Sequence, residues 1–271
     1  VMEKNGNPEK RQEFLKVSLL SVSLFLITYF VVVFITGLSE LYIAYDFDIP
    51  ATLCLKGTSF HISDSDPLWT RDALTSILLA TPVSSFVISM GAVFMFIVRK
   101  QKTEILLYTS IWLLLQSFNM TFGLISENLI TQSGVSRVAE LQGLGRSAII
   151  ISVGLAFYLM FQFGAFTARL LLAHGSATFR EHRYTTVIAF FILPWFFGNL
   201  ILLALIFPDI GLKDFLVKLM MLIMLLPAFF VRLPNQEPTK KSSANLLIIL
   251  PLLSLVVTWI SVAALQKCIS F

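Results

Sequence analysis

Seven long apolar runs divide this chain, and they restrict its fold more than any other feature of the sequence. A helix needs about 20 apolar residues to cross the roughly 30 Å hydrocarbon core of a bilayer. Most of the runs reach that length, and the weakest contains Lys218 and Pro227. We therefore predict an all-α, polytopic transmembrane helix bundle of about seven spans, at 17–37, 74–98, 104–129, 147–173, 186–207, 215–233 and 244–266.

The composition agrees with a chain that is surrounded by lipid. Hydrophobic residues make up 56% of the 271 residues and charged residues 13%, whereas soluble domains carry about one quarter charged residues. We expect a multi-pass protein in contact with membrane lipids, in a bacterial inner (cytoplasmic) membrane. The net charge of +4 comes with no basic block of the nucleic-acid-binding type, so we expect no nucleic-acid partner.

The distribution of basic residues predicts an orientation. If the N-terminus is cytoplasmic and seven spans follow, thirteen of the twenty Lys and Arg residues fall on the inner side and seven on the outer side. Basic residues collect on cytoplasmic loops, so this count favours a cytoplasmic N-terminus and a C-terminus outside. We expect a cytoplasmic polar tail at 1–16 and a single transmembrane domain at 17–271 with a long outer loop at 38–73.

Polar residues share one face of the third predicted span. At 100° per residue, Gln116, Asn119 and Glu127 fall within about 80° of one another. Amides in hydrocarbon are costly unless they find partners, so we expect this helix to lie in the interior. Interhelical hydrogen bonds are the first explanation of the set, and a solute cavity is the second. We predict that a polar interior near the bilayer centre brings together Gln116, Asn119, Tyr158, Gln162 and Asn199.

Two further polar sets sit on the predicted outer side. Glu127 ends the third span and is followed by Arg137 and Arg146, with which it can form an interfacial ion pair. Cys54 and Cys268 are the only cysteines, and the orientation puts both in an oxidising compartment. They form either a disulfide between the long loop and the last helix or two buried thiols.

The sequence carries no recognised catalytic or metal-binding motif. The sequence contains no H-E-x-x-H, G-x-S-x-G, phosphate-binding loop or dinucleotide-binding motif, so we expect no cofactor and lean towards a protein that is not an enzyme. One weak metal-binding candidate remains in His61, Asp64 and Asp66, although a solvated turn explains it better. In that interpretation Asp66 caps a helix that starts near Pro67.

Three functional hypotheses follow. The first is a non-enzymatic subunit or scaffold of a larger membrane assembly, bound to other membrane protein subunits. The second is a transporter or channel for a neutral or lipid-like solute, with a polar site at Gln116, Asn119 and Gln162. The third is a membrane enzyme with an outer-face site in the 38–73 loop.

Overall fold

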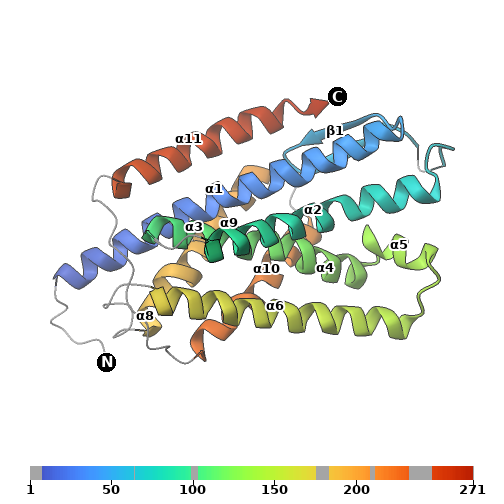
Figure 1. Cartoon of the computed structure of the whole chain (residues 1–271). Coiled ribbons are helices and arrows are strands. Elements are labelled where there is room, and N and C mark those ends of the chain that lie inside the picture. Colours follow the sequence, from blue (N-terminus) through green and yellow to red (C-terminus); the bar gives the residue numbers. More distant parts are fainter. Residues whose placement is uncertain are drawn as a thin grey trace.

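A computed structural model describes residues 8–63, 65–98, 103–174, 183–207, 211–231 and 246–270. As predicted, the structure is mostly helical (Figure 1). The helical elements are α1 (Pro8–Asp46), α2 (Arg71–Val98), α3 (Glu104–Phe118), η1 (Asn119–Gly123), α4 (Leu124–Thr131), α5 (Val135–Leu141), α6 (Arg146–His174), α8 (Arg183–Val187), η2 (Ile188–Ile192), α9 (Leu193–Ile206), α10 (Leu212–Leu225), η3 (Leu226–Phe229) and α11 (Leu246–Gln266).

Six helices in the described part of the chain are long and apolar enough to cross a membrane. They are Gln12–Asp46, Arg71–Val98, Glu104–Thr131, Arg146–Ala173, Tyr184–Ile206 and Ile249–Gln266. The remaining predicted run, 215–233, forms a shorter apolar helix, Phe215–Phe229. The long helices lie roughly side by side in one bundle (Figure 1), as expected of a membrane-embedded protein.

Helix α1 is the central element of the bundle, and it is longer than predicted. It packs against α2, α3, α9 and α11. It begins inside the predicted polar tail and ends at Asp46, so the expected loop at 38–73 shrinks to the segment between Asp46 and Arg71. Gly37 does not end the helix. It lies against the side chain of Leu53, where a Cβ atom would come within 2.6 Å of Leu53 Cδ1.

A small antiparallel sheet covers one end of the bundle, which the all-α prediction missed. Its strands are β1 (Ala51–Cys54), β2 (Gly57–Phe60) and β3 (Ile269–Ser270), in the order β2-β1-β3. We call β1, β2 and their connecting turn the hairpin. Leu53 of β1 pairs with Ile269 of β3, and a disulfide joins Cys54 to Cys268. The hairpin is therefore fastened to the end of the last helix.

Aromatic side chains of α1, α3 and η2 pack together in the interior of the helix bundle. Trp112 of α3 is fully buried and packs on Phe25 of α1, with ring centroids 5.0 Å apart, and on Phe190 of η2, 5.9 Å apart. The Trp112 indole Nε1–H donates to Ser21 Oγ at 2.7 Å, and Ser21 Oγ donates to the Phe190 carbonyl at 2.7 Å. We call Ser21, Phe25, Trp112 and Phe190 the aromatic core. Its hydrogen bonds join the Trp112 indole, the Ser21 hydroxyl group and the Phe190 carbonyl in one line.

Candidate functional site: a chamber beneath the hairpin

A cavity of about 490 Å³ lies between the hairpin and the helix bundle. Its walls come from α1, α2, α4, α9 and α10, and the hairpin and the loop after α4 complete them. We call it the hairpin chamber. Its size is within the range of roughly 300–1,000 Å³ that is usual for small-molecule sites. The charged and polar side chains that line it include Thr36, Glu40, Lys56, Thr58, Thr81, Glu127, Asn128, Ser133 and Lys218.

One face of α1 forms a long wall of the chamber. Tyr29, Val33 and Gly37 follow one another at four-residue spacing, and Thr36 and Glu40 continue the same face. With a rise of 1.5 Å per residue, Tyr29 and Glu40 are about 16 Å apart along the helix axis. The chamber is therefore elongated, and its two ends present different groups.

Glu40 stands at the hairpin end of this wall. Its Oε2 accepts a hydrogen bond from Thr58 Oγ1 of β2 at 2.5 Å, and its Oε1 accepts one from Thr81 Oγ1 of α2 at 2.5 Å. Among the described side chains, no cation forms a salt bridge with this carboxyl group. Glu40 thus ties the hairpin to two helices, and it presents an acidic group to the chamber.

A second carboxyl group belongs to α4 at the same end. Glu127 is only 2% exposed, and its Oε1 accepts a hydrogen bond from Thr131 Oγ1 at 2.9 Å. The neighbouring Asn128 side chain accepts from Ser133 Oγ at 3.0 Å. Gly134, with φ at 47°, fits tightly against this amide, where a Cβ atom would collide with it. The loop after α4 is therefore fixed at the chamber wall.

Lys218 of α10 lies at the other end of the chamber. Its Nζ is 5.4 Å from the centroid of the Tyr29 ring, which is a cation–π distance. Its main-chain carbonyl accepts a hydrogen bond from Trp195 Nε1 at 3.0 Å, and the carbonyl of Val217 accepts one from Asn119 Nδ2 at 3.0 Å. Two neighbouring helices thus hold this turn of α10 in place.

The predicted polar interior does not form as a single site. Gln116 and Asn119 are buried, at 3% and 5% exposure. Gln116 Nε2 and Asn119 Oδ1 have no hydrogen-bond partner among the described residues. Asn199 is also buried, but its amide donates to Trp195 within its own helix at 2.8 Å.

Two members of that predicted set face outwards, so the expected meeting of five residues near the bilayer centre is wrong. Tyr158 is 58% exposed, and Gln162 is exposed on the same face of α6. The reason is the place of α6 in the bundle. Small residues such as Gly164 and Ala168 of this helix are buried against its neighbours, which turns the opposite face outwards.

The other predicted sites have mixed outcomes. Arg137 and Arg146 are exposed whereas Glu127 is buried, and the ion pair between them stays a prediction.

No group of three metal-binding side chains occurs among the described residues. His61 Nε2 lies 2.9 Å from Thr52 Oγ1, Asp64 lies outside the described residues, and Asp66 accepts from the main chain of Leu68 in a turn. Asp66 does not cap a helix, because α2 begins at Arg71 and the Thr70 hydroxyl accepts from its first turn.

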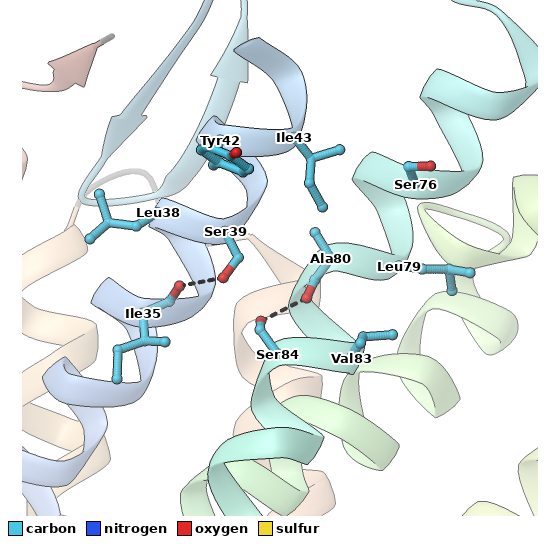
Figure 2. A pocket seen from close by; sticks show the side chains of 10 residues that line it. All are labelled: Ile35, Leu38, Ser39, Tyr42, Ile43, Ser76, Leu79, Ala80, Val83 and Ser84. Carbon is cyan, nitrogen blue, oxygen red and sulfur yellow. Dashed lines mark hydrogen bonds between the residues drawn. The ribbon is translucent and has the colours of Figure 1, made fainter. Parts of the chain in front are cut away.

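A second hollow differs from the chamber in its chemistry. It has a volume of about 800 Å³ and lies in the groove between α1 and α2 (Figure 2). Two of its hydroxyl groups are already used, because Ser39 donates to the carbonyl of Ile35 and Ser84 to that of Ala80 (Figure 2). The remaining wall is mostly apolar, including Leu38, Leu79 and Val83. This groove offers contacts to hydrocarbon, not to a polar solute.

Sequence reasoning missed most of the chamber. On sequence grounds Glu40 belongs to the loop at 38–73, and no sequence pattern connects it with Lys56 or Lys218. A usable signal was present, because no Gly or Pro interrupts the chain between Gly37 and Pro50, and a helix that continues past Gly37 brings Glu40 onto the face of Tyr29 and Val33.

No family model, curated protein or solved structure matches this chain. The chemistry of the chamber is therefore the basis of the functional proposal.

Proposed function

We propose that this protein is a membrane-embedded binding protein or carrier for a small polar solute, and that the hairpin chamber is its binding site. The observation that carries the proposal is a cavity of about 490 Å³ with carboxyl, ammonium and hydroxyl groups along its wall. Ionisable residues within transmembrane helices are costly, and they usually mark a pathway or binding site. The aromatic core packs rings around its polar atoms, whereas the chamber places charged and polar groups around a shared space, which is suited to a polar solute.

The proposal replaces the solute site expected from sequence. That site relied on Gln116, Asn119 and Gln162, and Gln162 faces outwards. It also changes the expected solute from a neutral or lipid-like molecule to a polar one, because both ends of the chamber carry charged groups. No recognisable catalytic set occurs among the described residues, and we therefore propose binding of the solute and no reaction.

A single introduced thiol tests the chamber as a solute site. Both native cysteines are joined in the disulfide, so Ser133→Cys adds the only free thiol, and Ser133 lines the chamber. We expect small polar compounds from a metabolite panel to slow the modification of this thiol by 2-aminoethyl methanethiosulfonate. The matched control is Ser147→Cys, which is exposed on α6 and should react at the same rate with or without them. Equal rates at Ser133→Cys across the panel would contradict the proposal.

We infer in addition that the two ends of the chain lie on opposite sides of the membrane. The disulfide requires Cys54 and Cys268 to be on the same side. Five of the six long helices lie between them, and five crossings alone would separate them. The segment containing Phe215–Phe229 therefore has to provide another crossing. Its 15 residues span only about 22 Å, which implies an irregular or short passage.

The basic-residue count favours a cytoplasmic N-terminus, and we keep a bacterial inner membrane as the location. Reporter domains fused to the two termini should therefore give opposite results, with activity of a cytoplasmic reporter only at the N-terminus. The same compartment for both ends would contradict the seven-crossing arrangement.

A second function, assembly with another membrane protein, is favoured by the outward face of α6. Gly154, Tyr158 and Gln162 recur on this face at four-residue spacing, and a Cβ atom at Gly154 would meet nothing within 4 Å. An amide that faces hydrocarbon has no hydrogen-bond partner, whereas a neighbouring protein helix supplies one. We propose a second copy of this chain as the occupant, because a glutamine amide is both donor and acceptor and complements itself across a two-fold axis.

Cross-linking tests this interface. With Gln162→Cys in native membranes, we expect a disulfide-linked dimer after mild oxidation, whereas Val87→Cys, exposed at 64% on a different helix, α2, should cross-link less. Native mass spectrometry of the Gln162→Leu variant should show fewer dimers than the unmodified protein. A monomer in both cases, or a different protein bound at this face, would rule out the homodimer.

A further inference from the structure

The two ends of the hairpin chamber carry opposite charges that are not paired with each other. Glu40 at the hairpin end contacts two hydroxyl groups, Thr58 and Thr81. Lys218 at the other end lies over the Tyr29 ring. Among the described side chains, neither group forms a salt bridge. Glu127 and Lys56 also line the chamber, but both make other contacts, and they do not carry the argument.

The separation of these two groups explains why they do not neutralise each other. Tyr29 and Glu40 are about 16 Å apart along α1, and the Lys218 Nζ is fixed near Tyr29. Charges that are removed from water are stable only when they find partners. A carboxyl group and an ammonium group at opposite ends of one cavity are therefore complementary to a solute with an amine at one end and an acid at the other.

We propose that the chamber binds an elongated zwitterion, with its amine at Glu40 and its acidic group at Lys218. This inference rests on the proposed solute-binding function and names the class of solute. An extended peptide chain gains about 3.3–3.6 Å per residue, so three to four residues bridge roughly 10–14 Å. A hydrogen bond of about 3 Å at each end of the solute spans the remainder. A tripeptide or tetrapeptide with free termini has the right length and charges. The Thr36 and Ser133 hydroxyl groups on the wall donate to the Val32 carbonyl and to Asn128 Oδ1, so their oxygen lone pairs are what they offer to the N–H groups of a peptide.

Capped peptides separate the roles of the two ends. Isothermal titration calorimetry on the full-length chain in mild detergent would compare triglycine, N-acetyl-triglycine and triglycine amide. The variant Lys218→Met should bind triglycine about ten- to hundredfold more weakly, because it loses a charge-assisted hydrogen bond, and it should bind triglycine amide as the unmodified protein does. The variant Glu40→Gln should weaken triglycine binding by a similar factor and leave N-acetyl-triglycine unchanged.

The controls keep the outcomes distinct. Lys267→Met and Glu140→Gln change exposed residues outside the chamber and should alter none of the affinities. Equal weakening of all three peptides by Lys218→Met, or equal binding of capped and free peptides to the unmodified protein, would overturn the inference. In that case protection of Ser133→Cys by neutral polar compounds would still support a solute site. The absence of protection by any compound would end the proposed function itself.

A lipid headgroup is the other source of a zwitterion in a membrane. Phosphatidylethanolamine carries its amine and phosphate only a few atoms apart, which is too short for the distance along α1. We therefore expect triglycine to bind equally well in nanodiscs made with phosphatidylethanolamine and in nanodiscs made with phosphatidylglycerol. Competition by phosphatidylethanolamine, with little or no binding of triglycine, would overturn the elongated solute.

Discussion

Around Trp112 the bundle is packed with rings, whereas around Glu40 it encloses a cavity of about 490 Å³. Both regions contain polar atoms in the interior of a membrane-embedded fold. In the aromatic core a single line of hydrogen bonds runs from Trp112 through Ser21 to the Phe190 carbonyl. In the hairpin chamber, carboxyl, ammonium and hydroxyl groups face a shared space instead.

The difference shows what decides between a structural and a binding role for buried polar groups. A group whose partners all come from neighbouring helices contributes to stability, and its loss should weaken the fold. A group that faces a cavity contributes less to stability and more to recognition. Substitutions that disrupt packing between helices, or the link between the hairpin and the last helix, should therefore lower stability more than hydrogen-bond losses at the chamber, and four experiments rank these effects.

The largest loss of stability is expected where α6 meets α10. Met224 of α10 places its carbonyl oxygen where a Cβ atom of residue 164 would lie, and backbone cannot move aside as a side chain can. The variant Gly164→Val should lose about 4 kcal/mol or fail to fold. Fluorescence-detected size exclusion after heating measures it. Gly91→Val is the matched control, because nothing lies within 4 Å of a Cβ atom there, and an equal loss in both variants would contradict this contact.

Removal of the disulfide should cost somewhat less. Cys54 and Cys268 are 214 residues apart in sequence, and a bridge that closes a long loop typically stabilises by about 2–4 kcal/mol. The double variant Cys54→Ser with Cys268→Ser should unfold at a lower temperature than the unmodified protein. A reductant should lower the unfolding temperature of the unmodified protein and leave the double variant unchanged. If the reductant affects both equally, the effect does not come from this bridge.

The third largest loss of stability is expected when the indole N–H of the aromatic core is removed. The variant Trp112→Phe keeps an aromatic ring but removes the donor to Ser21 and part of the buried volume, so we expect a loss of about 2 kcal/mol. Trp259→Phe, at a position that is 72% exposed, should change the stability little. Unfolding in a series of SDS concentrations measures both. Equal effects would contradict the expected contribution of the buried Trp112 contacts to stability.

The smallest effect is expected at the chamber. Thr58→Val keeps the shape of the side chain and removes one hydrogen bond to Glu40, which should cost about 1 kcal/mol. Thr52→Val on the neighbouring strand removes a hydrogen bond to the exposed His61 and a weak contact with Cys54 Sγ, and it should cost less. The same SDS series compares them. A loss at Thr58 as large as that at Trp112 would mean that Glu40 holds the fold together more than it serves binding.

Much of the fold could be predicted from sequence because hydrocarbon imposes a simple rule on helix length. The long apolar runs became helices, and the run at 215–233, the weakest of them, became a short one. The ends of the helices were harder. Polar residues such as Glu40 look like a loop in the sequence, but a helix can continue where neighbouring hydroxyl groups satisfy the side chain.

The candidate site was harder still, for a physical reason. Spacing shows which residues share a face of a helix, but in a membrane both the interior and the exterior are apolar, so hydropathy does not say which way that face points. Gln116 and Gln162 have similar neighbours in sequence. The first is buried and the second faces outwards. The chamber also depends on α1, α4, α10 and the hairpin together, which no local pattern reveals.

The pairing of β1 with β3 has a consequence for biosynthesis. A ribosome makes the hairpin first, and it makes Cys268 and Ile269 only after the five long helices that lie between the two cysteines. The hairpin over the chamber is therefore not yet joined to β3 or to Cys268 while the intervening helices enter the bilayer. Truncation before α11 would leave a protein whose helices can insert but whose chamber never closes.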